Sequence, residues 1–265
     1  IQVLPPTFAV ASLTGKITLP TNVQQLLYPS AIGQLRLFSD GDLSGLSIAM
    51  SDADPGLIGG AFARPIPFAP YQFPFVLSTT TDADLRDQHN RVPTHTGDQD
   101  PVYIFSNGNI TNSAIFLPKQ ARIAAGGDIT DMFFQGQNLA STDITRIRAD
   151  GNITGTIASS GSLPFVRSND FVLGGPGTFI LEAGGNIGPF VTSANLKDGN
   201  SGFIYSFGGG VRTIGNDYNP WLPNQGADLQ VRFGMAAGAD YTALSETYLD
   251  PANAGMLDGA LFVQV

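Results

Sequence analysis

The sequence predicts an all-β protein, a right-handed parallel β-helix with one long excursion outside the helix and little α-helix. Three observations support this prediction. A nine-residue pattern recurs five times along the 265 residues. Within the pattern, apolar residues recur with a period of two, which is typical of a strand with one buried face. The chain also contains 32 glycines and 18 prolines, with almost no helical periodicity.

The five copies are LRLFSDGDL, VYIFSNGNI, ARIAAGGDI, TRIRADGNI and FILEAGGNI, which begin at residues 35, 102, 121, 145 and 179. The intervals of 67, 19, 24 and 34 residues fit a unit of roughly 20 to 24 residues with insertions. One unit cannot bury its own strand face. We therefore predict that the units stack as coils, each strand pairing with its equivalent about 4.8 Å away in the next coil.

The end of each copy predicts a corner of the coil. The fifth place is always small, the seventh is glycine, the eighth is Asp or Asn and the ninth is Leu or Ile. Glycine suggests a turn with positive φ, and a short polar neighbour commonly bonds its own backbone in such a turn. Stacked carboxylates can instead bind calcium or cleave polysaccharides. A structural role is favoured because these places form the repeat and do not interrupt it. The corner residues are Gly41, Asp42, Gly108, Asn109, Gly127, Asp128, Gly151, Asn152, Gly185 and Asn186.

A Pro- and Phe-rich excursion interrupts the repeat between residues 51 and 100, after a predicted strand at residues 46–50. Long loops of this composition usually serve function or packing. We predict that the excursion packs on the outside of the helix and that any ligand binds at the seam between them.

Candidate ligand-binding residues lie in this excursion and near the C-terminus. The spacing His-x5-His sits on no predicted helix or strand, which favours packing or exposed histidines over a metal site. There is no cysteine and no Gly-x-Ser-x-Gly motif, so the sequence predicts no catalytic residue, metal or cofactor. The candidate residues are Tyr71, His89, His95, Tyr218 and Trp221.

Residues 195–265 are less regular than the repeats. Strands are predicted at residues 211–214 and 229–233, around a turn that carries Trp221. A short helix is predicted at residues 240–249, begun by Asp240 and stopped by Pro251. Such a helix would cap an exposed edge of the stack. We treat residues 1–265 as one domain.

Composition excludes several classes of partner. The net charge is −9 and the 13 basic residues are scattered, so a nucleic acid partner is not expected. No apolar run reaches the roughly 20 residues of a membrane-spanning helix. The first residues lack a signal-peptide pattern, which suggests a piece of something longer. The absence of cysteine is compatible with the cytosol and also with an exoprotein that stays unfolded while it crosses a membrane.

Longer segments carry a family resemblance. MSDADPG, DPVYIFSNGNI, GPGTFILEAGGNIG, RTIGNDYNPWLPNQGADLQV and GADYTALSETYLDPA, in this order from residue 50 to residue 252, resemble the C-terminal region of filamentous haemagglutinin family exoproteins. The resemblance implies a β-helical filament exported by an outer-membrane two-partner secretion transporter. It also implies a location outside the cell or on the bacterial surface, and a role in adhesion, aggregation or display of a toxic tip.

We therefore expect a structural or adhesive segment that is not an enzyme and that contacts a host-cell or glycan receptor. Two alternatives remain open. A polysaccharide lyase or glycosidase on the same fold would need converging carboxylates, and the chain has only two glutamates, Glu182 and Glu246. A glycan-binding module would use exposed Tyr71, Tyr218 or Trp221 as stacking platforms.

Overall fold

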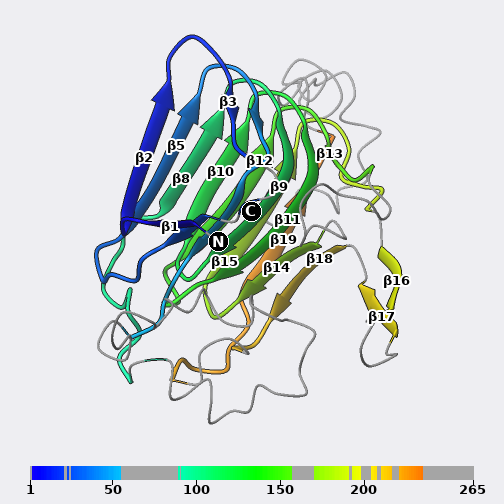
Figure 1. Cartoon of the computed structure of the whole chain (residues 1–265). Helices are drawn as coiled ribbons and strands as arrows, with labels where there is room; N and C mark the ends of the chain where they lie inside the picture. The colour runs from blue at the N-terminus through cyan, green and yellow to red at the C-terminus, as the bar shows by residue number, and fades with distance from the viewer. Residues whose placement is uncertain are drawn as a thin grey trace, which may run out of the picture.

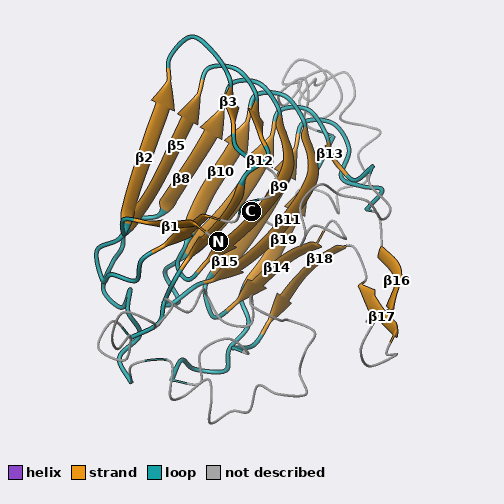
Figure 2. Cartoon of the chain, viewed as in Figure 1, coloured by secondary structure: helices purple, strands orange, loops and turns teal. Residues whose placement is uncertain are grey.

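The structure, a computed structural model, describes residues 2–20, 23, 25–54, 89, 91–156, 170–190, 193–197, 204–207, 210–216 and 221–234. These residues form strands and loops without a helix (Figures 1 and 2). Two large sheets, here sheet A and sheet B, contain parallel strand pairs only. The predicted all-β fold with parallel strands is confirmed.

Sheet B holds the repeats. Its seven strands, in spatial order, are β19 (Asp228–Arg232), β15 (Thr178–Ala183), β12 (Ile144–Ala149), β10 (Ala121–Ala125), β8 (Val102–Ser106), β5 (Gln34–Ser39) and β2 (Thr7–Ser12). The five predicted copies pair in the register that the sequence alignment gives. Their third places, for example, stack as Leu37, Ile104, Ile123, Ile147 and Leu181.

Sheet A has ten strands. Its main order is β1 (Gln2–Leu4), β4 (Gln25–Leu27), β7 (Ser47–Met50), β9 (Ile110–Leu117), β11 (Ile129–Gln137), β14 (Asp170–Gly174) and β18 (Gly210–Ile214). The short strands β3 (Ile17–Thr18), β6 (Leu43–Ser44) and β13 (Ile153–Thr154) pair beside this path. A separate antiparallel pair joins β16 (Ser193–Lys197) to β17 (Ile204–Phe207).

The chain alternates between the two sheets. After β2, β5, β8, β10, β12 and β15 it turns and contributes one or more strands to sheet A, then returns to the next strand of sheet B. Each pass thus adds one layer, as Figure 1 shows by the colour order across both sheets. The 67-residue interval between the first two copies contains the excursion, which leaves after β7 and returns before β8.

The core lies between the sheets and is filled by the alternating residues of sheet B and the facing residues of sheet A. Phe134 of β11 packs against Phe179 of β15, with ring centroids 6.0 Å apart. Both side chains are fully buried. Burial of such a side chain stabilises the fold by roughly 1.5–3 kcal/mol, so the repeated apolar places hold the layers together.

The corners are joined by a ladder of side-chain hydrogen bonds, here the corner ladder. The backbone N–H of Asn109 donates to Asp42 Oδ1 at 2.8 Å, and that of Asp128 donates to Asn109 Oδ1 at 2.8 Å. Asn152 and Asn186 continue it, donating to the residues one layer before at 2.6 and 2.8 Å. The prediction that these side chains bond their own backbone is therefore wrong, because the side chains of Asp42, Asn109, Asp128 and Asn152 accept from the next layer instead.

The corner ladder also explains the invariant glycine. None of Gly41, Gly108, Gly127, Gly151 and Gly185 has a positive φ, so that prediction is wrong. From Gly108 onward, the space that a Cβ would fill is taken by the ladder side chain of the preceding layer, and at Gly41 by the backbone of Gly15. The corner needs glycine for close approach between layers.

Positive φ occurs instead at a second bend, where three successive passes of the chain enter sheet A. Gly45, Asn112 and Asp131 have φ of 74°, 49° and 56° in three successive layers. Each stands two residues after the Leu or Ile that ends the nine-residue pattern. Glycine and Asn or Asp are the residues that tolerate this conformation best. The sequence could have predicted this bend, because Gly, Asn or Asp stands two residues after the ninth place of the pattern in these three copies.

Two further layers belong to sheet B beyond the five predicted copies. Phe8 and Val10 of β2 pair with Leu35 and Leu37, and Leu229 of β19 pairs with Phe179. The strands predicted at residues 211–214 and 229–233 are confirmed as β18 and β19, within one residue at each end. The helix predicted at residues 240–249 lies outside the described residues.

Candidate functional site

The excursion returns to the body of the protein through a buried cluster of ionisable side chains. We call Asp52, His89, His95, Asp98 and Lys119 the junction cluster. His89 and His95 are 3% and 2% exposed. His95 belongs to a turn region, residues 91–100, that leads into β8. The histidines are therefore packed side chains.

The first half of the cluster ties the two ends of the excursion together. Asp52 follows β7, where the excursion leaves, and its Oδ1 lies 3.2 Å from His89 Nε2. The hydroxyl of Thr94 donates to the backbone carbonyl of Asp52 at 2.9 Å. Two segments 37 or more residues apart in sequence thus meet at one point.

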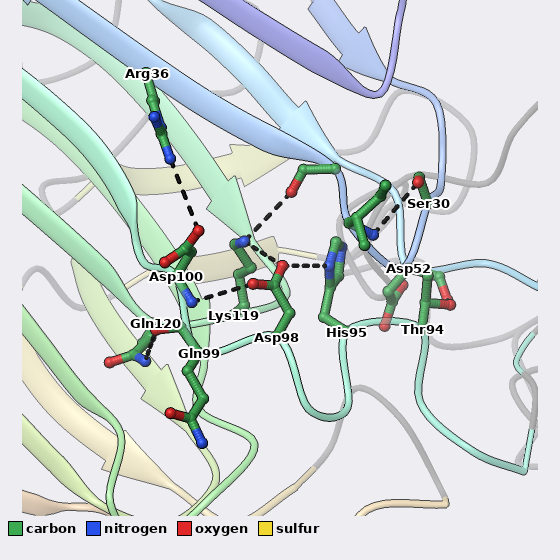
Figure 3. Close-up of polar contacts among 12 residues, drawn as sticks. Ser30, Arg36, Asp52, Thr94, His95, Asp98, Gln99, Asp100, Lys119 and Gln120 are labelled. Atoms are coloured by element: carbon green, nitrogen blue, oxygen red, sulfur yellow. Dashed lines mark hydrogen bonds and ion pairs between the residues drawn. The ribbon is translucent and has the colours of Figure 1, made fainter.

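The second half attaches the returning segment to the sheets (Figure 3). Lys119, which follows β9, places Nζ 2.6 Å from Asp98 Oδ2 and donates to the carbonyl of Gly33 at 3.3 Å. Asp98 Oδ2 also lies 3.5 Å from His95 Nδ1. Lys119 is 1% exposed. A buried ammonium group needs such partners to offset its desolvation.

Burial sets the protonation of His95. Desolvation, together with the smaller effect of the Lys119 charge, lowers its pKa to about 4, against the opposing effects of Asp52 and Asp98. Burial also lowers the pKa of Lys119, against the attraction of Asp98. Neither ring nitrogen of His95 has a hydrogen-bond partner in the described part of the chain. At neutral pH His95 is therefore uncharged, and Lys119 and Asp98 form the ion pair.

The two histidines do not converge on a shared point. Each lies against a different carboxylate, Asp52 for His89 and Asp98 for His95. Within the described ranges, no three His, Cys, Asp or Glu side chains are grouped so that they could hold a metal ion. The arrangement joins the excursion to the sheets and can take up a proton on acidification.

A surface depression adjoins the junction cluster on the outer face of sheet B. Its volume is about 540 Å³. Asp100 lies at its edge, 3.8 Å from Arg36, and the backbone N–H of Asp100 donates to Asp98 Oδ1 at 3.1 Å. The last residue of the excursion therefore connects the depression to the junction cluster. The lining residues are Ala9, Val10, Ala11, Arg36, Leu37, Phe38, Asp100, Tyr103 and Phe105.

Sequence reasoning did not select these lining residues. Arg36, Phe38, Tyr103 and Phe105 occupy the second and fourth places of the first two copies, which face away from the core. The signal was present, because aromatic residues fill these outward places only in those two neighbouring copies. The later copies have Arg122 and Ala124, then Arg146 and Arg148, then Ile180 and Glu182.

The other predicted ligand-binding residues do not meet at this depression. Tyr71 and Tyr218 lie outside the described residues. Trp221 is partly buried, and the guanidinium carbon of Arg91 lies 5.4 Å from the centroid of its ring. This cation–π geometry links the returning end of the excursion to the segment before β19.

Compared with protein-family profiles, curated protein sequences and solved structures, the chain gives no match. In the part of the chain that the structure describes, no helix is long and apolar enough to cross a membrane.

Proposed function

We propose that sheets A and B are the walls of a right-handed parallel β-helix. The alternation of the chain between the sheets, the parallel in-register pairing and the corner ladder all support a coil that rises by one strand per pass. The short strands β3, β6 and β13 fit a third, narrow wall at the corner. Right-handedness follows from the general preference of parallel crossover connections.

This β-helix is a structural and adhesive segment of a large bacterial exoprotein, secreted or attached to the cell surface. The observation that carries the proposal is the in-register stack itself, with its repeated corners and one differentiated place, the depression beside the junction cluster. The resemblance to filamentous haemagglutinin family exoproteins supports the same role. A regular stack supplies length and stiffness, while the differentiated place supplies contact.

Export by an outer-membrane two-partner secretion transporter is the route that this proposal implies. The chain has no cysteine, so no disulfide obstructs passage in an unfolded state. Folding outside the cell can proceed by adding one layer to the next, because each layer contacts only its neighbours.

Attachment of epithelial cells to surfaces coated with the 265-residue protein tests the adhesive role. We expect attachment that saturates with coating density and is blocked by excess soluble protein. The same protein, thermally unfolded before coating, is the control. Attachment equal to that of the unfolded control, or attachment that soluble protein does not block, would overturn the proposed adhesive function.

A further inference from the structure

The outer face of sheet B carries a patch of three aromatic side chains, here the aromatic patch: Phe38, Tyr103 and Phe105. The pairing of β5 with β8 places Phe38 beside Phe105 and Arg36 beside Tyr103. The rings of Tyr103 and Phe105 lie 5.8 Å apart. Phe38 is 36% exposed although it is a large apolar residue. The patch therefore offers apolar ring surface outside the core.

The neighbouring strand β2 leaves room next to this patch. Its outward side chains are Ala9 and Ala11, which pair with Arg36 and Phe38. Because two alanines stand beside three aromatic rings, the face is hollowed into the depression of about 540 Å³. This volume lies within the range of roughly 300–1,000 Å³ that small-molecule sites occupy. One wall is aromatic, the floor is small and apolar, and the edge is charged.

The charged groups around the depression offer contacts to hydroxyl groups and to an anion. Arg36 and Asp100 are well exposed and only 3.8 Å apart, so both can bind hydroxyl groups. On the far side of Tyr103, its register partner Arg122 projects from β10. Among the described residues, no carboxylate forms an ion pair with Arg122, whereas Arg146 and Arg148 on the next strand pair with Glu182 and Asp150. The Arg122 guanidinium donates from Nη1 to the carbonyl of Ala121 at 3.4 Å. Its other N–H groups can bind a ligand anion beside the aromatic patch.

We propose that the depression binds an acidic glycan, with one pyranose ring stacked on the aromatic patch and the carboxylate of a sugar that extends past Tyr103 bound by Arg122, which lies on the next strand outside the lining of the depression. This proposal rests on the adhesive function proposed above and narrows its partner to one chemical class. The apolar face of a pyranose suits Tyr103 and Phe105, and its hydroxyls suit the Arg36–Asp100 pair. Single-stranded nucleic acid also stacks on aromatic residues, but it needs a basic groove along its phosphate backbone, and the 13 basic residues are scattered.

Titration calorimetry with tetragalacturonate tests the proposal, with cellotetraose as the uncharged probe of equal length. Tetragalacturonate should bind, and cellotetraose should bind at least about tenfold more weakly, because one charge-assisted contact is lost. Arg122→Gln should reduce tetragalacturonate affinity about tenfold, and Tyr103→Ala should abolish measurable binding. Arg148→Gln, an exposed arginine on the same face that already pairs with Asp150, is the matched control and should bind as the parent does.

Circular dichroism and thermal melts of each variant verify that the sheets persist. Absence of tetragalacturonate binding, binding unchanged in both Arg122→Gln and Tyr103→Ala, or equal affinity for cellotetraose would overturn the proposal. Tighter binding of a dT8 oligonucleotide than of tetragalacturonate would also overturn it. Cell attachment separates the two proposals: attachment without glycan binding contradicts only the ligand class, and glycan binding without attachment contradicts only the adhesive function.

Discussion

Sheets A and B share one core but differ in the environment of their other faces. The outward residues of the inner strands of sheet A are buried, as at Leu26, Phe116 and Phe133. The outward residues of sheet B alternate with the core and are exposed at Arg36 and Phe38. A strand that is buried on both faces has a continuous run of apolar residues. A strand with one solvent-exposed face alternates between apolar and polar residues. Parallel pairing alone therefore does not decide where a ligand can bind, and among the described residues the outer face of sheet B is the more accessible one.

The largest difference between the sheets should appear when an outward aromatic residue is truncated. Phe116→Ala on sheet A should lower the free energy of unfolding by about 3–5 kcal/mol, because it empties a buried site next to Phe133. Phe38→Ala on sheet B should cost less than about 1 kcal/mol, since the ring is already partly in water. Urea denaturation of both variants measures the difference. Equal costs would contradict the distinction between the two outer faces.

A second effect arises where the chain passes between the sheets, at the junction cluster. The native pKa of His95, about 4, is below its ordinary value of 6.5, so the unfolded chain takes up the proton first. The stabilisation from neutral His95 is complete above pH 6.5 and is lost as the pH falls to 4, by at most about 3 kcal/mol. Stability measured against pH for the parent and for His95→Gln should diverge over this window.

Asp170 changes the stability with pH in the opposite direction to His95. The effect of His95 must therefore be measured as the difference between the parent and His95→Gln. Burial raises its pKa to about 6, although Arg212 opposes the shift. Because the native state then holds this proton more tightly, Asp170 adds stability as the pH falls from 6 towards 3.8. Both proteins contain Asp170, so its contribution cancels in the difference. Parallel pH profiles for the parent and His95→Gln would contradict the assignment of the window to His95.

A smaller effect should isolate the corner ladder, the contact that holds successive layers at one corner. Gly151→Ala places a Cβ where Asp128 Oδ1 lies and should cost about 1–3 kcal/mol. In the background of Asp128→Ala, which removes that oxygen, the same substitution should cost much less. A double-mutant cycle by chemical denaturation gives the coupling. Additive costs would show that the glycine is required for another reason.

Much of sheet B could be predicted from the sequence because apolar residues recur with a period of two in its strands, and most of these strands are followed by Gly, then Asp or Asn, then Leu or Ile. The copy that begins at Phe8 was not recognised because it has one extra residue before Gly15. The copy that begins at Leu229 was not recognised because no Asp or Asn follows Gly234. The strands of sheet A, such as Ile110–Leu117, have no such alternation after residue 113. Both faces of these strands are buried, and burial of the outer face depends on contacts with residues far away in sequence, which the local sequence does not predict.

The corner glycines and the junction cluster show two further limits of prediction from the sequence. Glycine serves both positive φ and close approach, and only the neighbouring layer shows which one applies at Gly127 or Gly151. The meeting of His89 with Asp52 depends on how a long excursion closes, which a spacing of two histidines does not encode. The aromatic patch could have been found, because outward places of adjacent copies become neighbours once the repeat is stacked.

The central claim is that successive repeats pair in parallel, in the register of the nine-residue pattern, and the absence of native cysteine allows a direct test. Ala124 and Arg148 are register partners on β10 and β12. In the double variant Ala124→Cys/Arg148→Cys, mild oxidation should form an intramolecular disulfide, since neighbouring parallel strands place Cα atoms within the roughly 4.4–6.8 Å that a disulfide spans. The control Ala124→Cys/Arg146→Cys, displaced by two residues, should stay reduced. A disulfide in the displaced pair and none in the register pair, identified by mass spectrometry of proteolytic peptides, would contradict the stacked-repeat fold.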